Sequence, residues 1–305
     1  MMTAMNLEWQ PSMQGIRGSL KMDEPMCRHT SWRLGGRADY YFVPADREDL
    51  LEFLSRLPVD LPLMWVGLGS NLLVRDGGLR GVVIATPKGL SDIHRIDDQQ
   101  VYAEAGVACA QVARFCTRND LLGAEFLAGI PGSFGGALAM NAGAFGGETW
   151  DVIHAVDLVD RTGRVERVSA QRFSPDYREI DLLPGRWFLG AELSLESGDG
   201  SVGKSRVQSL LKRRGDSQPV QSANAGSVFR NPDGDFAARL IEAAGLKGHL
   251  IGDAEVSTKH ANFIINRGQA TAADVEQLID FIQQTVKDRF AVELTPEVRV
   301  VGESI

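Results

Sequence analysis

Apolar and polar positions in the first third of the chain follow two different periods. Residues 39–43, 62–66 and 81–85 are short, mostly apolar runs bounded by turn-forming residues, which is typical of strands. Between the first two, residues 46–57 repeat apolar side chains at helical spacing behind Asp46, a favourable helix cap. This order predicts a small β–α–β unit.

Beyond residue 99 the pattern becomes rich in strands. Turn-forming residues separate four runs that we expect to be strands: 100–105, 152–160, 163–169 and 187–195. A helix is expected over 107–120, where Cys109 and Cys116 lie seven residues apart on one apolar face. We interpret both thiols as core residues.

The last third predicts two helices, 235–246 and 271–290, and Thr271 with Asp274 resembles a capping box at the start of the second. Residues 197–205 are polar and glycine-rich, so we expect a linker there. The chain is therefore predicted to be an α+β protein of about three lobes. The expected divisions are an N-terminal segment (1–30), two lobes (31–87 and 88–197) and a C-terminal domain (198–305).

Composition and charge exclude several classes of protein. The chain has 305 residues with 40 acidic and 32 basic side chains, a net charge of −8, which argues against a nucleic-acid or anionic-membrane surface. No apolar run approaches the ~20 residues of a membrane span, and the first twenty residues lack a signal-peptide core, so a cytoplasmic location is expected. Cys27, Cys109 and Cys116 form no CxxC pair, and no catalytic metal is expected.

One motif points to a different chemistry. Residues 198–205 read GDGSVGKS, which matches the G-x-x-x-x-G-K-[ST] pattern of a phosphate-binding P-loop. The mechanism also needs an acidic residue after a later apolar strand to hold magnesium, and no such residue is evident. We therefore favour a linker leading into a basic helix, with a nucleotide triphosphatase as the alternative.

Residues 126–148 hold seven of the 33 glycines beside Pro131 and no basic residue. Glycines let a ligand approach the main chain, so that successive N–H groups can bind a phosphate without a cation. A tight structural turn is the alternative. The candidate cofactor-binding residues here are Gly129, Ile130, Pro131, Gly132, Ser133, Gly136, Ala137, Asn141 and Gly143.

A second glycine loop follows the expected strand at 62–66. It offers Gly67, Gly69, Ser70 and Asn71, but Leu72 stands where the dinucleotide fingerprint needs its third glycine. A Rossmann domain is therefore not expected. Two glycine loops on two lobes suit a diphosphate held between them, as in flavin adenine dinucleotide (FAD).

Six segments now carry a resemblance in chain order from His29 to Glu303. They read HTSWRLGGRADYYFVP, GLGSNLLVRDGGLRGVVI, AEFLAGIPGSFGGALAMNAGAFGGE, NAGSVFRNP, AEVSTKHANFIIN and LTPEVRVVGE. Together they resemble the UDP-N-acetylenolpyruvoylglucosamine reductases, in their shorter variant without the extra substrate loop. The resemblance implies a two-lobed FAD-binding region of the vanillyl-alcohol-oxidase type plus a substrate domain. It also implies FAD as cofactor, NADPH as co-substrate, and reduction of UDP-N-acetylglucosamine enolpyruvate to UDP-N-acetylmuramate for peptidoglycan.

Three residues match the catalytic motifs of that family. Ser227 matches the proton donor, Arg178 matches the arginine that binds the substrate carboxylate, and Glu297 matches the carboxyl group that stabilises the enolate. Ile180 stands where the family commonly has a serine, which departs from the pattern around Arg178. Without the family context, each of the three would be interpreted as a turn or surface residue.

The resemblance also implies substrate-binding residues. Tyr177, Asn231 and His260 match positions that line the family's substrate site, and Arg213 with Arg214 suits the uridine diphosphate. Arg299 lies two residues beyond Glu297 and could steady either that carboxyl or the diphosphate. A basic cluster is more often a solvated helix face. The partner expected is a small-molecule substrate, bound by a monomer.

Two alternatives stay open alongside the P-loop. A flavin-dependent oxidase of related fold would act on a different small alcohol or acid, which the joint presence of Ser227 and Glu297 in their motifs disfavours. A non-catalytic nucleotide-sugar binding module would keep both glycine loops without turnover.

Overall fold

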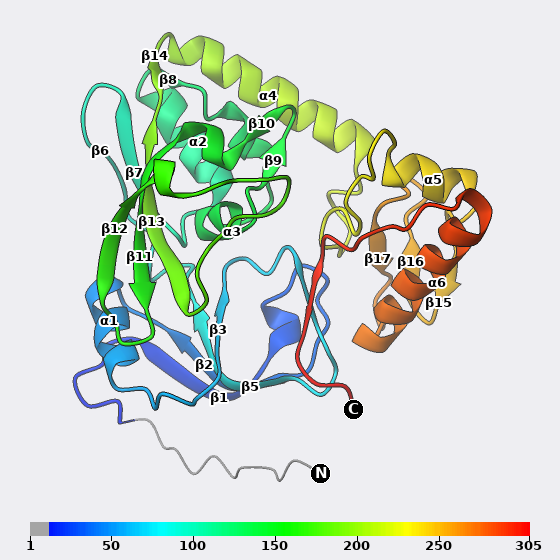
Figure 1. Ribbon diagram of the computed structural model, residues 1–305, viewed down its shortest axis with the longest axis horizontal. Helices are drawn as coiled ribbons and strands as arrows, with labels where there is room; N and C mark the ends of the chain where they lie inside the picture. The colour runs from blue at the N-terminus through cyan, green and yellow to red at the C-terminus, as the bar shows by residue number, and fades with distance from the viewer. Residues whose placement is uncertain (1–11) are drawn as a thin grey trace.

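The computed structural model describes residues 12–305, arranged as two lobes and a C-terminal domain (Figure 1). Lobe 1 is built on a four-stranded sheet of order β1-β2-β5-β3, in which β2, β5 and β3 run parallel and β1 is antiparallel. Its elements are β1 (Ser19–Pro25), β2 (Arg37–Val43), β3 (Leu63–Val66), β5 (Leu79–Ala85) and helix α1 (Arg47–Ser55). The predicted β–α–β unit is confirmed.

Asp46 caps α1 as the sequence predicts, because its carboxylate accepts a hydrogen bond from the Asp49 N–H at 3.0 Å. The carboxylate of Asp49 in turn accepts from the backbone N–H groups of Arg17, Gly18 and Ala45. The two carboxylates therefore fix the start of the helix against the incoming chain.

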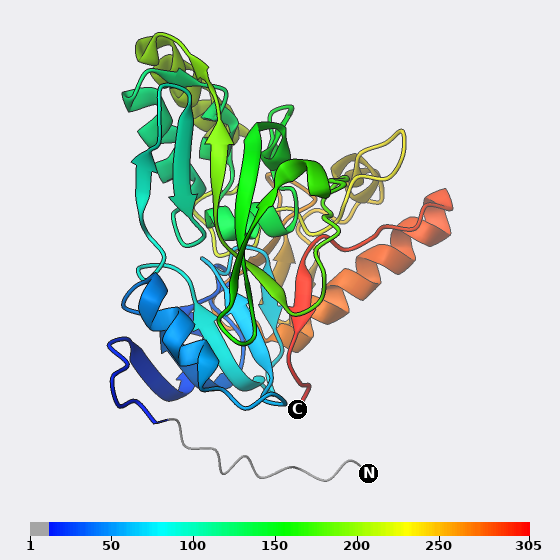
Figure 2. The ribbon, with the colours of Figure 1, turned by 60° about the vertical axis from the view of Figure 1, so that its left-hand side comes forward.

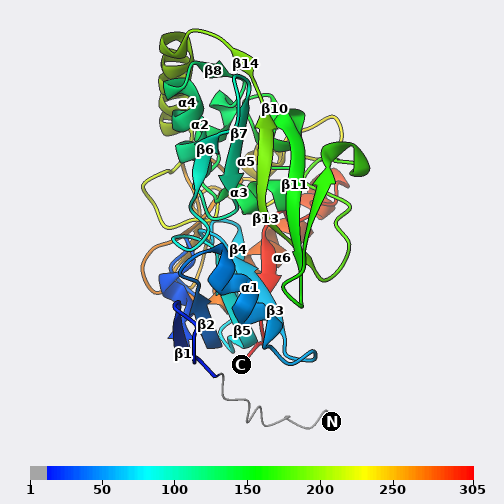
Figure 3. The same cartoon turned by 90° about the vertical axis from the view of Figure 1, so that its left-hand side faces the viewer.

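Lobe 2 is an antiparallel five-stranded sheet of order β12-β11-β13-β7-β6. Short helices lie between β7 and β11 in the chain and cover one face of the sheet (Figures 1 and 3). Its elements are β6 (Ile93–Arg95), β7 (Gln100–Glu104), α2 (Cys109–Arg118), β8 (Leu121–Leu122), η2 (Glu125–Gly129), α3 (Phe134–Ala139), β9 (Gly143–Ala144), β10 (Gly147–Glu148), η3 (Thr149–Val152), β11 (Ile153–Asp160), β12 (Val165–Ser169), η4 (Ala170–Arg172), β13 (Arg186–Ser194) and β14 (Glu196–Ser197).

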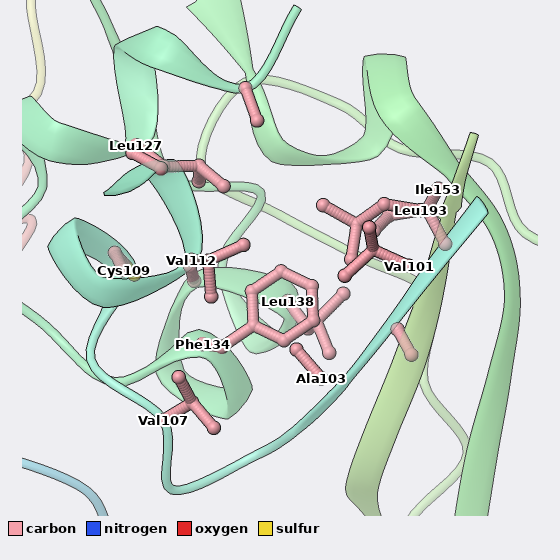
Figure 4. Packing of buried hydrophobic residues seen from close by; sticks show 14 of the residues in the cluster. Val101, Ala103, Val107, Cys109, Val112, Leu127, Phe134, Leu138, Ile153 and Leu193 are labelled. Carbon is pink, nitrogen blue, oxygen red and sulfur yellow. The ribbon is translucent and has the colours of Figure 1, made fainter. Parts of the chain in front are cut away.

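The core of lobe 2 anchors the glycine-rich segment. Phe134, the first residue of α3, is fully buried among Val101, Val112 and Leu138 (Figure 4). Removing such a buried ring typically costs about 3–5 kcal/mol, so the loop before Phe134 is held firmly by packing. Cys109 belongs to the same core, and burial raises the pKa of its thiol to about 12. Its predicted role as a core residue is confirmed.

The C-terminal domain packs two helices against a three-stranded sheet of order β15-β16-β17. The capping box at the start of α6 is present, with the Thr271 hydroxyl accepting from the Asp274 N–H and the Asp274 carboxylate from the Thr271 N–H. The elements of this domain are α5 (Ala237–Ala243), β15 (Leu250–Ile251), β16 (Ala254–Val256), β17 (Ile264–Asn266) and α6 (Ala272–Phe290). Two further elements of this part of the chain pack elsewhere: α4 (Gly200–Ser217) on lobe 2, and β18 (Arg299–Val301) beside lobe 1.

The expected linker at 197–205 is wrong from Gly200 onward, because α4 begins there. The Asp199 carboxylate caps the helix by accepting from the Ser201 N–H at 2.8 Å. A Cβ on Gly200 would lie 2.1 Å from the Thr117 carbonyl oxygen, and one on Gly203 would lie 2.8 Å from the Thr117 methyl group. The glycines thus let α4 approach α2 closely. A helical backbone at 200–205 also excludes the P-loop conformation for GDGSVGKS.

The end of the chain returns to lobe 1. Strand β18 pairs in parallel with β4 (Leu72–Val74), and Figures 2 and 3 show the C-terminal strand running beside lobe 1. Trp32 is buried in the core of the C-terminal domain, and its indole N–H donates to the Ile264 carbonyl at 2.8 Å. Lobe 1 and the C-terminal domain therefore exchange segments. Among the described residues, no helix is both long and apolar enough to cross a membrane.

Candidate active site between the lobes

The two glycine loops predicted from the sequence face each other across the junction of the lobes. A Cβ added to Gly67 would lie 2.0 Å from the Ser133 hydroxyl oxygen, and one on Gly132 would lie 3.3 Å from that of Ser70. The loops lie more than fifty residues apart in the sequence. Folding brings them into van der Waals contact, as a shared phosphate site requires.

Backbone geometry explains why glycine stands at these positions. Gly69 has a φ of +62°, and its Cβ would lie 2.0 Å from the His29 carbonyl oxygen, so another residue would be both strained and in collision. Ser133 caps α3 by accepting from the Gly136 N–H at 3.4 Å. Within residues 12–305, the N–H groups of Gly132 and Ser133 donate to no protein acceptor. Both donors remain available to a ligand.

A cavity of about 560 Å³ lies between the loops. Its volume is within the range of pockets that bind cofactors. Nine of the predicted cofactor residues line it: Gly67, Gly69, Ser70, Asn71, Ile130, Gly132, Ser133, Gly136 and Ala137.

Four other predicted cofactor residues lie outside the cavity wall. Gly129 is buried beneath the Phe145 ring, which its Cβ would approach to 2.5 Å, and Pro131 is exposed to solvent. Asn141 and Gly143 direct their carbonyl oxygens at the Arg178 guanidinium instead, at 3.5 Å and 3.3 Å. The first half of the glycine-rich segment therefore contributes to the cavity wall, and its second half contacts the Arg178 guanidinium.

Part of the cavity wall carries no recognisable sequence motif. The segment 182–188, which includes the first residues of β13, lines the cavity together with β3. Its Trp187 ring stacks on Trp65 with the ring centroids 5.4 Å apart. Neither tryptophan belongs to a recognisable binding motif, so only the fold reveals their place.

The cavity fits a flavin dinucleotide by the character of its walls. Apolar side chains make up most of the lining, free N–H groups come from the glycine loop, and Arg186 and Arg299 are the charged residues among the described lining. The Trp65 indole nitrogen is buried and has no hydrogen-bond partner among the described residues. A large, partly aromatic ligand with one diphosphate matches this surface.

Beside the cavity, Arg178 and Glu297 form a largely buried ion pair. The Arg178 Nε lies 3.2 Å from the Glu297 Oε1, and the side chains are only 16% and 14% exposed. The two residues come from different parts of the chain, a loop of lobe 2 and the segment before β18. The structure thus brings together two of the three predicted catalytic residues.

Burial raises the pKa of Glu297, while the nearby Arg178 and Arg230 guanidinium groups oppose the rise. The carboxyl group is therefore easier to keep protonated than an exposed glutamate. A protonated carboxyl can donate a hydrogen bond to a developing negative charge.

Ser227 lies on a segment paired with the segment that carries Glu297. The Glu297 N–H donates to the Val228 carbonyl at 2.7 Å, and Phe229 forms a bridge with Pro296. The Asn262 side chain holds Phe229 on both sides, accepting from its N–H at 2.9 Å and donating to its carbonyl at 2.8 Å. Two rigid pairings therefore fix the backbone at Ser227 beside Glu297.

The predicted substrate residues take several positions. Tyr177 is 39% exposed and lies under the Arg178 guanidinium, 4.8 Å from its ring centroid. Asn231 accepts from the Ala237 N–H at 3.1 Å and so supports the start of α5. His260 has a buried Nδ1 without a partner among the described residues, and burial lowers the pKa of its ring.

The basic residues of α4 separate from one another. Arg213 reaches lobe 2, with its guanidinium 5.7 Å from the Phe145 ring centroid. Burial lowers the pKa of Arg214, whose Nε donates to Gln218 at 3.1 Å. Arg299 lines the cavity, and Glu297 pairs with Arg178 rather than with Arg299.

Comparison with known proteins follows the same division of the chain. An FAD-binding domain family matches residues 38–169, and the C-terminal domain of UDP-N-acetylenolpyruvoylglucosamine reductase matches residues 218–301. The reductase of Methylococcus capsulatus is 55% identical over 94% of this chain and 95% of its own. The chain belongs to the UDP-N-acetylenolpyruvoylglucosamine reductase family.

Two further reductases of this family support the assignment. That of Alkalilimnicola ehrlichii is 56% identical over 94% of this chain and 96% of its own. The crystal structure of the Thermus caldophilus reductase superposes with a TM-score of 0.78 at 31% identity, covering 93% of this chain and 98% of that one. The reductase fold predicted from the sequence is therefore confirmed.

Proposed function

We propose that this protein catalyses the FAD-dependent reduction of UDP-N-acetylglucosamine enolpyruvate to UDP-N-acetylmuramate, with NADPH as the reductant, in the synthesis of peptidoglycan precursors. The arrangement that carries this proposal is a glycine-lined cavity beside the largely buried Arg178–Glu297 pair. The family membership of the whole chain supports it.

The loops around Gly67 and Gly132 would hold the FAD diphosphate through their N–H groups, with Arg299 as a cation in the wall. Bound FAD would supply the redox chemistry by taking a hydride from NADPH and passing it to the enolpyruvyl double bond. The other residues of the chain only need to bind, orient and protonate the substrate.

Addition of hydride to the terminal alkene carbon places negative charge on the adjacent carbon and its carboxylate. Arg178 would bind that carboxylate in a two-point contact, and the raised pKa of Glu297 suits a carboxyl that donates to the enolate. Ser227 would then give its hydroxyl proton to the carbon. This division of roles needs the three groups around one substrate, and the pairing of their segments supports it.

The remaining candidate residues concern the outer parts of the substrate. We propose that Tyr177, Asn231, His260, Arg213 and Arg214 contact the sugar and the uridine diphosphate. A cytoplasmic monomer without nucleic-acid or membrane partners completes the proposal, and the net charge of −8 supports the absence of those two partners. We also propose two lobes that grip FAD, with β1 counted in lobe 1, and a C-terminal domain that binds the substrate.

The test is the absorbance of the purified holoprotein under anaerobic conditions. NADPH should bleach the flavin bands, and UDP-N-acetylglucosamine enolpyruvate should restore them. A non-catalytic binding module would hold flavin without bleaching. A protein that is bleached but recovers with oxygen alone would be an oxidase, and either result would refute the proposal.

A further inference from the structure

The backbone at Arg178 adopts an unusual conformation. Its φ is +60°, in the left-handed region that residues with a side chain seldom occupy. Such a residue persists only when its surroundings hold it. Because this backbone aims the guanidinium at Glu297, the group that holds it also controls the geometry of the ion pair.

Two backbone hydrogen bonds between Asp176 and Glu179 close the turn at Arg178, at 3.0 Å and 3.2 Å, and Arg230 adds contacts to this turn from another segment. The Arg230 Nη2 donates to the Arg178 carbonyl oxygen at 3.3 Å, and its Nη1 lies 3.8 Å from the Glu179 carboxylate. One guanidinium therefore spans two consecutive residues of the loop. The rigid, planar fork of arginine suits such a two-point contact, which a lysine ammonium cannot reproduce.

Arg230 is itself fixed relative to Glu297. Its backbone N–H donates to the Thr295 carbonyl at 2.9 Å, beside the bridge between Phe229 and Pro296. The side chain is 33% exposed, yet its Nε is buried and has no hydrogen-bond partner among the described residues. The segment that carries Arg230 is therefore held directly against the segment that carries Glu297.

We propose that Arg230 is a positioning residue that clamps the backbone of Arg178 and Glu179, so that the Arg178 guanidinium is held for the substrate carboxylate. This inference rests on the proposed function, which assigns Arg178 to that carboxylate. The positive charge of Arg230 has a second effect. Together with Arg178, it lowers the pKa of Glu297 and so opposes the rise caused by burial. The Glu179 carboxylate faces Arg230 from the loop.

The first measurement is calorimetric affinity for UDP-N-acetylglucosamine enolpyruvate, made on oxidised FAD holoenzyme without NADPH. Arg230→Met should weaken binding by about tenfold to a hundredfold, since the charge-assisted contact between Arg178 and the substrate carboxylate would be weakened. Arg230→Lys keeps the charge but makes only one of the two contacts, so its affinity should lie between that of the wild type and that of Arg230→Met. The control is Arg239→Met, which removes an arginine 56% exposed on α5 and should leave the affinity unchanged.

The second measurement is the pH profile of flavin reoxidation by the substrate. Activity that needs protonated Glu297 falls as the pH rises through its pKa. Loss of the Arg230 charge raises that pKa further, so the alkaline limb should move to higher pH in Arg230→Met and stay in place in Arg230→Lys. A merely structural role for Arg230 would not separate the two variants in this way.

The outcomes distinguish this inference from the proposed function. Wild-type affinity in Arg230→Lys would overturn the clamp even if Arg230→Met failed to fold. A wild-type holoenzyme that binds the substrate but never reoxidises with it would refute the proposed function alone. In that case the affinities of the two variants would still decide the role of Arg230.

Discussion

The glycine loops and the charged cluster build two neighbouring sites in opposite ways. Each loop is a short stretch of sequence whose backbone forms the site, as at Gly69, where only glycine fits the left-handed turn against His29. The charged cluster consists of side chains from distant segments, and Arg178 and Glu297 meet although 119 residues separate them. A site made of backbone is encoded locally, whereas a site made of side chains depends on the completed fold.

This difference predicts that the two sites fail separately. A change in a loop should remove the flavin, and a change in the cluster should leave the flavin bound while slowing the reaction with substrate. The variants below test that separation in order of decreasing expected effect, and Ser227→Ala, the most direct test, comes last.

Arg178→Met should slow flavin reoxidation by the substrate about 10²–10³-fold, because a charge-assisted contact to the developing enolate is lost. Anaerobic stopped-flow absorbance would measure this step. Flavin content and the rate of bleaching by NADPH should stay at wild-type values. A variant purified without flavin would contradict the separation, since Arg178 lies outside the cavity wall.

Gly69→Ala should destabilise the protein by about 1–3 kcal/mol, because the methyl group meets the His29 carbonyl in a strained conformation. It should also be purified largely without FAD. The matched control is Gly215→Ala in α4, where a Cβ meets nothing within 4 Å and helix propensity favours alanine. Flavin content from the absorbance ratio measures both variants, and full occupancy in Gly69→Ala would refute the account of this loop.

Much of the fold could be predicted from local pattern. The strands around Val83, the α1 cap at Asp46 and the capping box of α6 follow from periodicity and side-chain hydrogen bonds within one turn. The glycine loops were also predicted, because glycine spacing reports backbone conformation directly. Their meeting across the lobes followed from the chemistry of a diphosphate rather than from the pattern itself.

The remainder depends on contacts between distant segments. Gly200 and Gly203 resemble linker glycines in the sequence, but they serve the close packing of α4 against Thr117. Arg230 lies between Ser227 and Asn231, both of which matched the family, yet its contact with the Arg178 carbonyl exists only in the folded chain. No sequence motif identified Trp187 as part of the cavity wall.

Glu297→Gln should change how stability depends on pH. The folded chain holds the pKa of Glu297 above its unfolded value of about 4.3, so its contribution is complete below that pH and is lost as the pH rises through the folded pKa. The wild type should therefore lose stability relative to the variant as the pH increases over this range. Urea unfolding at a series of pH values would measure it, and parallel curves would show that burial does not perturb this carboxyl.

Lys204→Ala should have the smallest effect, within about 0.5 kcal/mol of unfolding free energy, because the side chain is exposed on α4. Flavin content and turnover should also be unchanged. The measurement is thermal unfolding together with ATP hydrolysis. ATPase activity in the wild type that Lys204→Ala abolishes would revive the P-loop interpretation of GDGSVGKS.

The most direct test of the account separates the two half-reactions in Ser227→Ala. Ser227 lies on the segment paired with that of Glu297 and is not part of the cavity wall. We expect the variant to bind FAD and to be bleached by NADPH at the wild-type rate, while reoxidation by UDP-N-acetylglucosamine enolpyruvate slows about 10²–10⁴-fold for want of the proton donor. Reoxidation at the wild-type rate would contradict the assignment of chemistry to the charged cluster.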